Sequence, residues 1–246
     1  MWTADKLVYR GEDDFIRAYQ GSELVWEKPS SNNKIFYTST DGQIVTPDIG
    51  IGEESKGFGA NIVSNTYSGG RGVIVFDGPV TKIGYTAFGR CNTLQTIVIP
   101  DSVTSIGRSA FSYCTSLTTI TIPDSVTSIG QIAFFSCERL TSITIPKSVK
   151  RIDIGVFGKC TSLISITIPF SVRGIKWDAF KDCSQLSEVI VNAVTPPELY
   201  PEQYIGIYNQ FENNAPGRKI KVPAESLQAY KTAPGWSDYA DDIIAQ

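Results

Sequence analysis

Apolar residues recur along the middle of this chain with a fixed period of 23 residues. A proline ends a short run of alternating apolar and polar residues at the same place in four successive units: Pro100, Pro123, Pro146 and Pro169. Three further series keep the interval: Phe88, Phe111, Phe134, Phe157 and Phe180; Leu94, Leu117, Leu140, Leu163 and Leu186; Cys91, Cys114, Cys137, Cys160 and Cys183. A period of this length indicates a repeat architecture in which each unit stacks on the next.

One unit, CTSLTTITIPDSVTSIGQIAFFS at residues 114–136, shows what each part is expected to form. Thr119 and Thr121 alternate with apolar residues, which predicts a strand with its apolar side chains inward and its threonines outward. Pro123 has no N–H to donate and ends the strand, and the Asp-Ser pair after it favours a turn. A second short extended run follows, and then a helical or 3₁₀ turn that places Phe134 in the core.

No unit is large enough to bury its own apolar face, so stacking is required. We therefore expect a β-dominated repeat solenoid with a parallel sheet, about six rungs long, over residues 73–192. Residues 31–72 and 193–246 are expected to form the caps that exposed solenoid ends require. Residues 1–30 hold apolar runs around two glycine-containing turns, which predicts a small β-hairpin module.

The recurring pattern C-x-x-L-x-x-I-x-I-P-x-x-V-x-x-I-x-x-x-A-F resembles the BspA-like leucine-rich repeat family, known from surface proteins of host-associated anaerobic bacteria. The resemblance implies a leucine-rich repeat fold, an open sheet face as the ligand platform, and adhesion to host extracellular-matrix proteins or neighbouring cells. Residues 34–47 and 57–78 resemble the N-terminal cap of such proteins. Residues 219–243 resemble their closing segment: a strand, a helix after a proline, and an aromatic turn around Trp236 and Tyr239.

The first thirty residues carry a different resemblance. Two Tyr-x-Gly motifs, at Tyr9 and Tyr19, are followed by Leu-Val-Trp, and this segment resembles short modules of phage and prophage structural proteins. It implies an alternative function, in which residues 1–30 dock onto a larger assembly such as a virion and the solenoid faces a bacterial receptor. The expected location is extracellular or on the bacterial cell surface, with the virion as the alternative; the start of the chain shows no secretory leader, which is either removed or never present.

Composition limits the chemistry. The chain has no histidine, which excludes an imidazole base, a Ser/His/Asp or Cys/His pair and a His-containing metal site. It shows no phosphate-binding loop or nucleophile elbow. We therefore expect no catalytic residue, no metal and no cofactor. A net charge of -3 gives no basic field for nucleic acid, and no stretch approaches the roughly 18 apolar residues of a membrane span.

The five cysteines stand one per unit, which would place them in a line rather than around one ion. Neighbouring rungs are about 4.8 Å apart, which exceeds the Cβ separation of about 3.5 to 4.5 Å in disulfides. The sequence therefore predicts buried, free thiols that act as small apolar residues.

Two surfaces are candidates for binding a protein or a glycan. The first is the outward face of the sheet, with one ladder of residues from Val75 through Val98 to Ile190 and a second beside it; its candidate binding residues are Thr119, Thr121, Ser142, Thr144, Ser165 and Thr167. The other explanation of these residues is that β-branched side chains simply suit a strand.

The second surface is basic. Residues 147–182 contain seven basic and three acidic residues within an acidic chain. This imbalance predicts contact with an acidic protein or a polyanionic glycan, although a solvated face gives the same pattern. Its candidate residues are Lys150, Arg151, Arg173, Lys176 and Trp177, with the tryptophan as the expected anchor.

Overall fold

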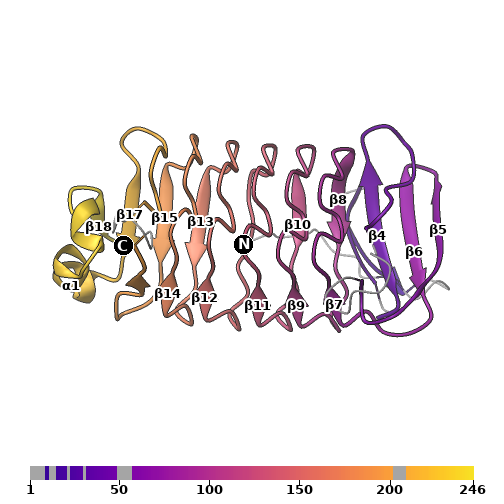
Figure 1. Cartoon of the computed structure of the whole chain (residues 1–246), viewed down its shortest axis with the longest axis horizontal. Helices are drawn as coiled ribbons and strands as arrows, with labels where there is room; N and C mark the ends of the chain where they lie inside the picture. Colours follow the sequence, from indigo (N-terminus) through magenta and orange to yellow (C-terminus); the bar gives the residue numbers. More distant parts are fainter. Residues whose placement is uncertain (1–8, 11–14, 21–22, 30–31, 49–56, 202–208) are drawn as a thin grey trace.

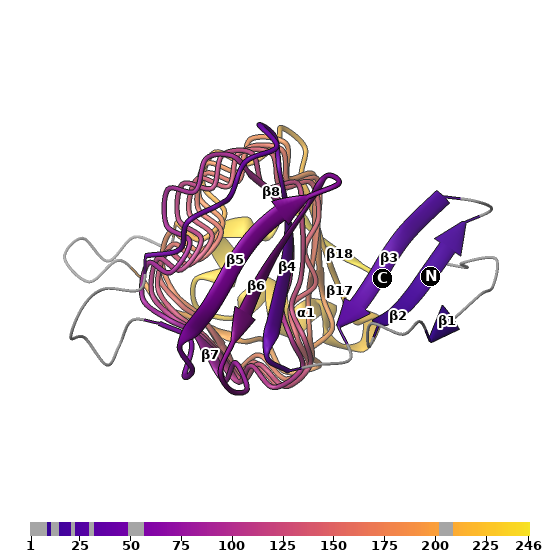
Figure 2. The ribbon, with the colours of Figure 1, turned by 90° about the vertical axis from the view of Figure 1, so that its right-hand side faces the viewer.

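The computed structural model describes residues 9–10, 15–20, 23–29, 32–48, 57–201 and 209–246. The rungs lie side by side along one axis and form a solenoid of about 7 turns, with an antiparallel sheet at one end and helix α1 (Leu227–Thr232) at the other (Figure 1). Viewed along the axis, the rungs superimpose on one another (Figure 2). The expected β-dominated solenoid is confirmed.

Most rungs contribute one strand to a long parallel sheet. Its strands are β8 (Leu94–Val98), β10 (Thr119–Thr121), β13 (Ser165–Ile168), β15 (Glu188–Val191), β17 (Lys219–Val222) and β18 (Ile243–Ala245). In β10, Ile120 is buried whereas Thr119 and Thr121 are exposed, as the alternation predicts. Equivalent residues of neighbouring rungs pair in register, so Thr119 lies beside Thr96.

A shorter strand follows in nearly every rung and forms a second parallel row: β7 (Lys82–Ile83), β9 (Ser105–Ile106), β11 (Ser128–Ile129), β12 (Arg151–Ile152), β14 (Gly174–Ile175) and β16 (Glu198–Leu199). This row consists of two sheets, β7–β9–β11 and β12–β14–β16, so its pairing is interrupted between β11 and β12. The long sheet is interrupted in the same rung, where residues 140–145 contribute a single bridge, from Thr144 to Thr167.

The interruption coincides with the end of a run of glycines. A Cβ atom at Gly107 would lie 2.8 Å from the carbonyl carbon of Gly84, and one at Gly130 would lie 2.5 Å from the backbone nitrogen of Arg108. Gly84, Gly107 and Gly130 all lack a positive φ, so a left-handed backbone is not the reason for glycine here. The position requires a residue without a Cβ atom because the neighbouring backbone is too close. Asp153 occupies the next equivalent position, and its Cβ atom rules out an equally close approach to the preceding rung.

The interior is a stack of equivalent apolar side chains. Six rings stack with centroids 5.3 to 5.7 Å apart and planes within 12° of one another: Phe88, Phe111, Phe134, Phe157, Phe180 and Phe211. Phe58 covers the first ring at 5.7 Å and Trp236 the last at 6.0 Å. Full burial of each ring contributes about 1.5 to 3 kcal/mol, so the stack is a large part of the driving force for folding.

Serine hydroxyls join the rungs beside this stack. Ser102, Ser125, Ser148 and Ser171 donate, at 2.5 to 2.8 Å, to the carbonyl oxygens of Val80, Val103, Val126 and Val149 respectively. Each bond satisfies a backbone carbonyl in the preceding rung. The sequence indicates only a turn at these serines; their role in stacking is a finding of the structure.

The Ala-Phe segment of each rung folds into hydrogen-bonded turns, and the described residues between 57 and 201 contain no helix. Two series of residues adopt a positive φ at the 23-residue interval: Thr86, Ser109, Ile132, Gly155 and Asp178; Arg90, Tyr113, Ser136, Lys159 and Asp182. This backbone conformation directs N–H groups at the next rung, as when Tyr113 N donates to Phe135 O at 2.7 Å. The inter-rung hydrogen bonds offset the cost of left-handed residues other than glycine.

At the N-terminal end, β4 (Lys34–Ser39), β5 (Ile62–Ser68) and β6 (Arg71–Phe76) form an antiparallel extension of the long sheet, in the order β10–β8–β4–β6–β5. The expectation that Val75 neighbours Val98 in one ladder is wrong, because β4 lies between their strands. Phe36 of β4 is opposite Val98, and Lys34 is opposite Val75. A separate antiparallel sheet has the order β1–β2–β3, with β1 (Tyr9–Arg10) and β3 (Glu23–Pro29) both paired to β2 (Phe15–Gln20).

The C-terminal end is closed by β17, η1 (Ala224–Ser226), α1, η2 (Trp236–Tyr239) and β18. The order of strand, proline, helix and aromatic turn follows the sequence, whereas β18, which pairs parallel with β17, has no sequence signal. The Arg218 guanidinium lies 5.4 Å from the ring of Phe211 and 5.3 Å from that of Tyr239, which seals the stack. Of the helical elements in the described chain, none has the length and hydrophobicity needed to cross a bilayer.

Candidate functional site

The outward face of the long sheet carries a row of small hydroxyl side chains, which we call the threonine face. All six residues expected there are exposed: Thr119, Thr121, Ser142, Thr144, Ser165 and Thr167. Thr121 lies beside Val98, and Thr167 beside Ile190, so the ladder crosses the sheet in register. The face can accept and donate hydrogen bonds, but it offers no aromatic or charged side chain to anchor a partner.

A second surface lies where the long sheet turns into the row of short strands. We call it the basic corner and define it as Lys147, Lys150, Arg151, Phe170 and Arg173. Arg173 N donates to Lys150 O at 2.8 Å, so these two residues occupy neighbouring rungs. All five residues are exposed.

The charges of the basic corner are only partly compensated. Asp153 lies 3.7 Å from Arg151 and 3.6 Å from Lys176, and it neutralises part of their charge. Lys147, Lys150 and Arg173 form no ion pair within the described chain. A cluster of cations without partners creates a positive potential that favours an acidic ligand.

Phe170 is the exposed aromatic residue of this surface, with 59% of its area accessible. Phe170 is not among the binding residues expected from the sequence, although a signal exists: it stands where the preceding units have Asp101, Asp124 and Lys147. A large apolar side chain at a turn position that is otherwise polar has no role in the core. Phe170 is therefore a large exposed aromatic side chain on the basic corner, of a kind that the threonine face does not offer.

Trp177, the expected anchor, is partly buried. Its ring centroid lies 5.9 Å from Lys176 Nζ, and its carbonyl accepts from Gly155 N at 3.2 Å, so it helps to stack the turn segment. The structure thus brings Lys150, Arg151 and Arg173 together and links Lys176 to them through Asp153. It places Trp177 at the start of the turn segment instead.

All five cysteines are free, and four are buried, whereas Cys91 is partly exposed. The thiols of Cys114, Cys137, Cys160 and Cys183 donate at 3.0 to 3.2 Å to the carbonyl oxygens of phenylalanines in the preceding rung. Burial raises the pKa of every thiol, to about 11 for Cys91 and about 12 for Cys183. Thiols held in the protonated form are poor nucleophiles, which suits a structural role.

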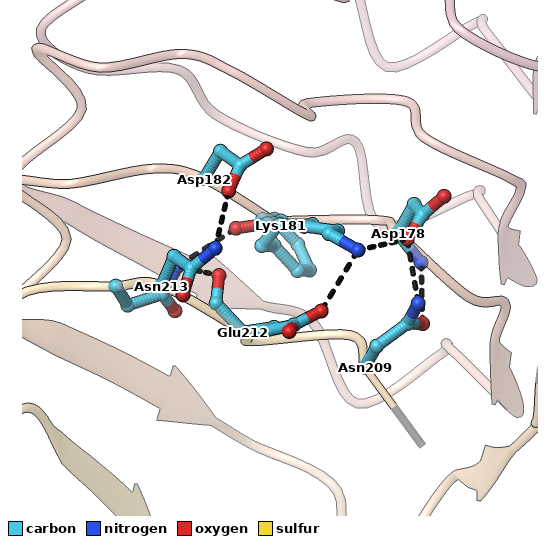
Figure 3. Close-up of polar contacts among 8 residues, drawn as sticks. Asp178, Lys181, Asp182, Asn209, Glu212 and Asn213 are labelled. Carbon is cyan, nitrogen blue, oxygen red and sulfur yellow. Dashed lines mark hydrogen bonds and ion pairs between the residues drawn. The ribbon is translucent and has the colours of Figure 1, made fainter. Parts of the chain in front are cut away.

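A cluster of acidic and amide side chains near the C-terminal end also resembles a site (Figure 3). Lys181 Nζ lies 2.8 Å from Glu212 Oε2 and 3.7 Å from Asp178 Oδ1, and Asn209 Nδ2 donates to the same Asp178 oxygen at 2.7 Å. Asn213 Nδ2 donates at 2.7 Å to a carboxylate oxygen in the preceding rung. The hydrogen bond that Lys181 donates to the Glu212 carboxylate raises the pKa of Lys181.

The backbone shows what this cluster does. Phe180 N donates to Gln210 O and Asp182 N to Glu212 O, both at 2.9 Å. The same backbone hydrogen bonds join each of the preceding pairs of neighbouring rungs. Asn209 Oδ1 accepts from Asp178 N at 3.1 Å, where preceding rungs supply a backbone carbonyl. Residues 209–214 are therefore one more turn of the solenoid, and the cluster fastens it in place.

The chain matches a known family over its repeat. Residues 81–196 match the model of the BspA type leucine rich repeat region, in 6 copies. No curated protein matches the chain. The family match does not include residues 1–30, and nothing in the comparisons supports the resemblance of that segment to phage proteins.

Several solved structures are similar. A leucine rich repeat protein of T. pallidum is 31% identical, with 59% of this chain and 67% of that one covered and a TM-score of 0.46. A leucine rich cell surface protein of Faecalibacterium prausnitzii is 22% identical, with 65% and 59% covered and a TM-score of 0.34. The pneumococcal vaccine antigen PcpA is 15% identical, with 68% and 44% covered and a TM-score of 0.42.

The family match and the stacked 23-residue rungs agree on one assignment. Residues 81–196 of this chain are a BspA-type leucine-rich repeat region.

Proposed function

We propose that the chain is a non-enzymatic binding protein that attaches to a protein or glycan partner on a bacterial or host surface, outside the cell that makes it. The observation that carries this proposal is the basic corner, where Phe170 is 59% exposed and three of the four cations form no ion pair within the described residues. Interface hot spots are rich in aromatic residues and arginine, and the basic corner presents Phe170 together with Arg173.

The rigidity of the scaffold supports the same function. Lys150 and Arg173 are held in neighbouring rungs by a backbone hydrogen bond, and Ser171 Oγ donates to Val149 O at 2.8 Å beside them. A partner that binds there does not have to order the backbone of the site, so little affinity is lost to conformational entropy. The threonine face adjoins the corner, since Thr167 and Phe170 belong to one rung, and it supplies hydrogen bonds at the edge of the contact.

The partner is expected to be acidic, because the free charges of the basic corner are positive. An acidic protein and a sulfated glycan both satisfy this condition. The experiment that separates them uses a reconstituted basement-membrane matrix, left untreated, digested with protease, or digested with glycosaminoglycan lyases. Fluorescently labelled full chain should bind the untreated matrix saturably and lose binding after one of the two digestions, which assigns the partner class. An absence of saturable binding both to the matrix and to intact bacterial cells would contradict the proposal.

A further inference from the structure

A third surface, on the turn side of the rungs, combines aromatic rings with cations. We call it the aromatic strip and define it as Arg90, Tyr113, Phe135 and Lys159. The Arg90 guanidinium lies 5.3 Å from the Tyr113 ring centroid, Tyr113 and Phe135 meet edge to face at 5.6 Å, and Lys159 Nζ lies 5.7 Å from the Phe135 centroid. The strip runs along the solenoid axis, because these residues belong to four successive rungs.

The backbone holds the strip in place. Arg90, Tyr113 and Lys159 occupy the same position of their rungs, each with φ near 60°. Their N–H groups donate to the next rung at 2.7, 2.7 and 2.8 Å. The Phe135 ring lies against Gly158, where a Cβ atom would be 3.0 Å from the ring. The backbone of the strip and the Phe135 ring are therefore held in place before any ligand arrives.

The chemistry of the strip favours an acidic ligand. Its two cations rest on ring faces, and the acidic groups of the adjoining rung are engaged, Asp178 with Lys181 and Asp182 with Asn213. Tyr113 is 42% exposed and next to Arg90, so apolar and charged contacts are available side by side. A sugar that stacks on an aromatic residue needs an open ring face, and here cations occupy ring faces. A peptide that offers carboxylates to the cations and an apolar side chain to the rings fits better.

The spacing of Arg90 and Lys159 along the solenoid indicates the conformation of that peptide and the separation of its carboxylates. The backbone positions of Arg90 and Lys159 stand three rung intervals apart, which is about 14 Å at the spacing of neighbouring strands. In an extended peptide, side chains four residues apart lie on one face at about 13 to 14 Å, with the side chain of the middle residue between them. We propose that the aromatic strip binds an extended acidic peptide segment with two carboxylates four residues apart and an apolar residue midway, which contacts Tyr113 and Phe135.

The test uses the full chain and two labelled peptides of the same composition. One contains Glu-Thr-Leu-Thr-Glu and the other Glu-Glu-Thr-Leu-Thr, and fluorescence anisotropy measures their dissociation constants. We expect the first peptide to bind at least tenfold more tightly. The double variant Arg90→Gln/Lys159→Gln should lose at least tenfold for this peptide, whereas Arg139→Gln/Lys219→Gln, which removes the same charge from exposed residues elsewhere, should change it less than twofold.

Phe135→Leu tests the rings separately from the charges, and it should weaken binding of the first peptide severalfold without a change in melting temperature above a few degrees. Three results would overturn the proposal: no binding of either peptide, equal binding of both, or an equal loss in the two double variants. A heparin tetrasaccharide that displaces the first peptide at equal charge concentration would also overturn it, by assigning the strip to glycans. None of these variants changes a residue of the basic corner, so a difference between the two double variants reports on the aromatic strip alone.

Discussion

The ring of Phe211 stacks on that of Phe180 at 5.4 Å and 3°, although 31 positions rather than 23 separate them in the sequence. The stack of rings thus continues past the last regular repeat. Arg218 then closes it, with its guanidinium on the Phe211 ring and a hydrogen bond from Nη1 to Phe211 O at 2.6 Å. Phe211 therefore joins the C-terminal cap to the last repeat by the same ring stacking that joins one repeat to the next.

Replacement of this ring should destabilise the whole solenoid. Phe211→Ala removes a fully buried aromatic side chain and leaves a cavity, so we expect a loss of about 3 to 5 kcal/mol in the free energy of unfolding. Urea denaturation followed by circular dichroism measures it. Phe170→Ala is the matched control, because Phe170 is exposed, and it should change stability by less than about 0.5 kcal/mol. A loss for Phe211→Ala no greater than the control's would show that residues 209–214 are not part of the stack.

The close approach of the rungs at the glycine positions predicts a steric effect. In Gly130→Ala, the new methyl group would meet the backbone nitrogen of Arg108 at 2.5 Å, so the rungs must separate, at a cost of about 1 to 3 kcal/mol. In the control variant Gly78→Ala, the nearest atom is Ala60 Cβ at 3.9 Å, an ordinary contact. Thermal denaturation of both variants tests the difference. Equal melting temperatures would mean that the stacking distance is not limited at Gly130.

The buried thiols predict a loss of stability at alkaline pH. Burial raises the pKa of Cys160 well above the usual value of 9.0, so above pH 9 the unfolded chain releases a proton that the folded protein keeps. Each such thiol lowers the free energy of unfolding by about 1.4 kcal/mol per pH unit in this range. Between pH 8 and pH 10, Cys160→Ala should therefore lose about 1.4 kcal/mol less stability than the unmodified chain, as urea denaturation at the two pH values measures. The same loss in both proteins would contradict the burial of this thiol.

The parts of the fold that follow from local pattern were predictable. The 23-residue period assigns the inward side chains of a regular rung, and Leu117, Ile120 and Phe134 are all buried as expected. The antiparallel insertion of β4 was not predictable. Its pairing of Tyr37 with Ile97 joins residues 60 positions apart, and such a pairing produces no repeating pattern in the sequence. The turn of the solenoid at residues 209–214 was not predicted, because Phe211 follows Phe180 by 31 positions and so breaks the 23-residue period.

The candidate sites divide in the same way. Charge composition located Lys150, Arg151 and Arg173, and the structure brings them to one corner. Charge composition does not identify Phe170, whose exposure is indicated only by its place at a turn position that is polar in the preceding units. The pairing of Arg90 with Tyr113 joins neighbouring rungs through side-chain direction, which a sequence pattern does not contain.

The most direct measurement of the proposed function compares the binding of three forms of the full chain to the basement-membrane matrix at 50 and 150 mM NaCl. They are the unmodified chain, Lys147→Glu/Lys150→Glu/Arg173→Glu in the basic corner, and Arg108→Glu/Arg139→Glu/Lys219→Glu, which makes the same change of charge at exposed residues elsewhere. Circular dichroism first establishes that all three are folded. We expect binding of the unmodified chain to weaken at the higher salt, as screened charge pairs do, the corner variant to bind at least tenfold more weakly, and the control to stay within about threefold. An equal loss in the two triple variants, or none in the corner variant, would contradict the proposed role of the basic corner.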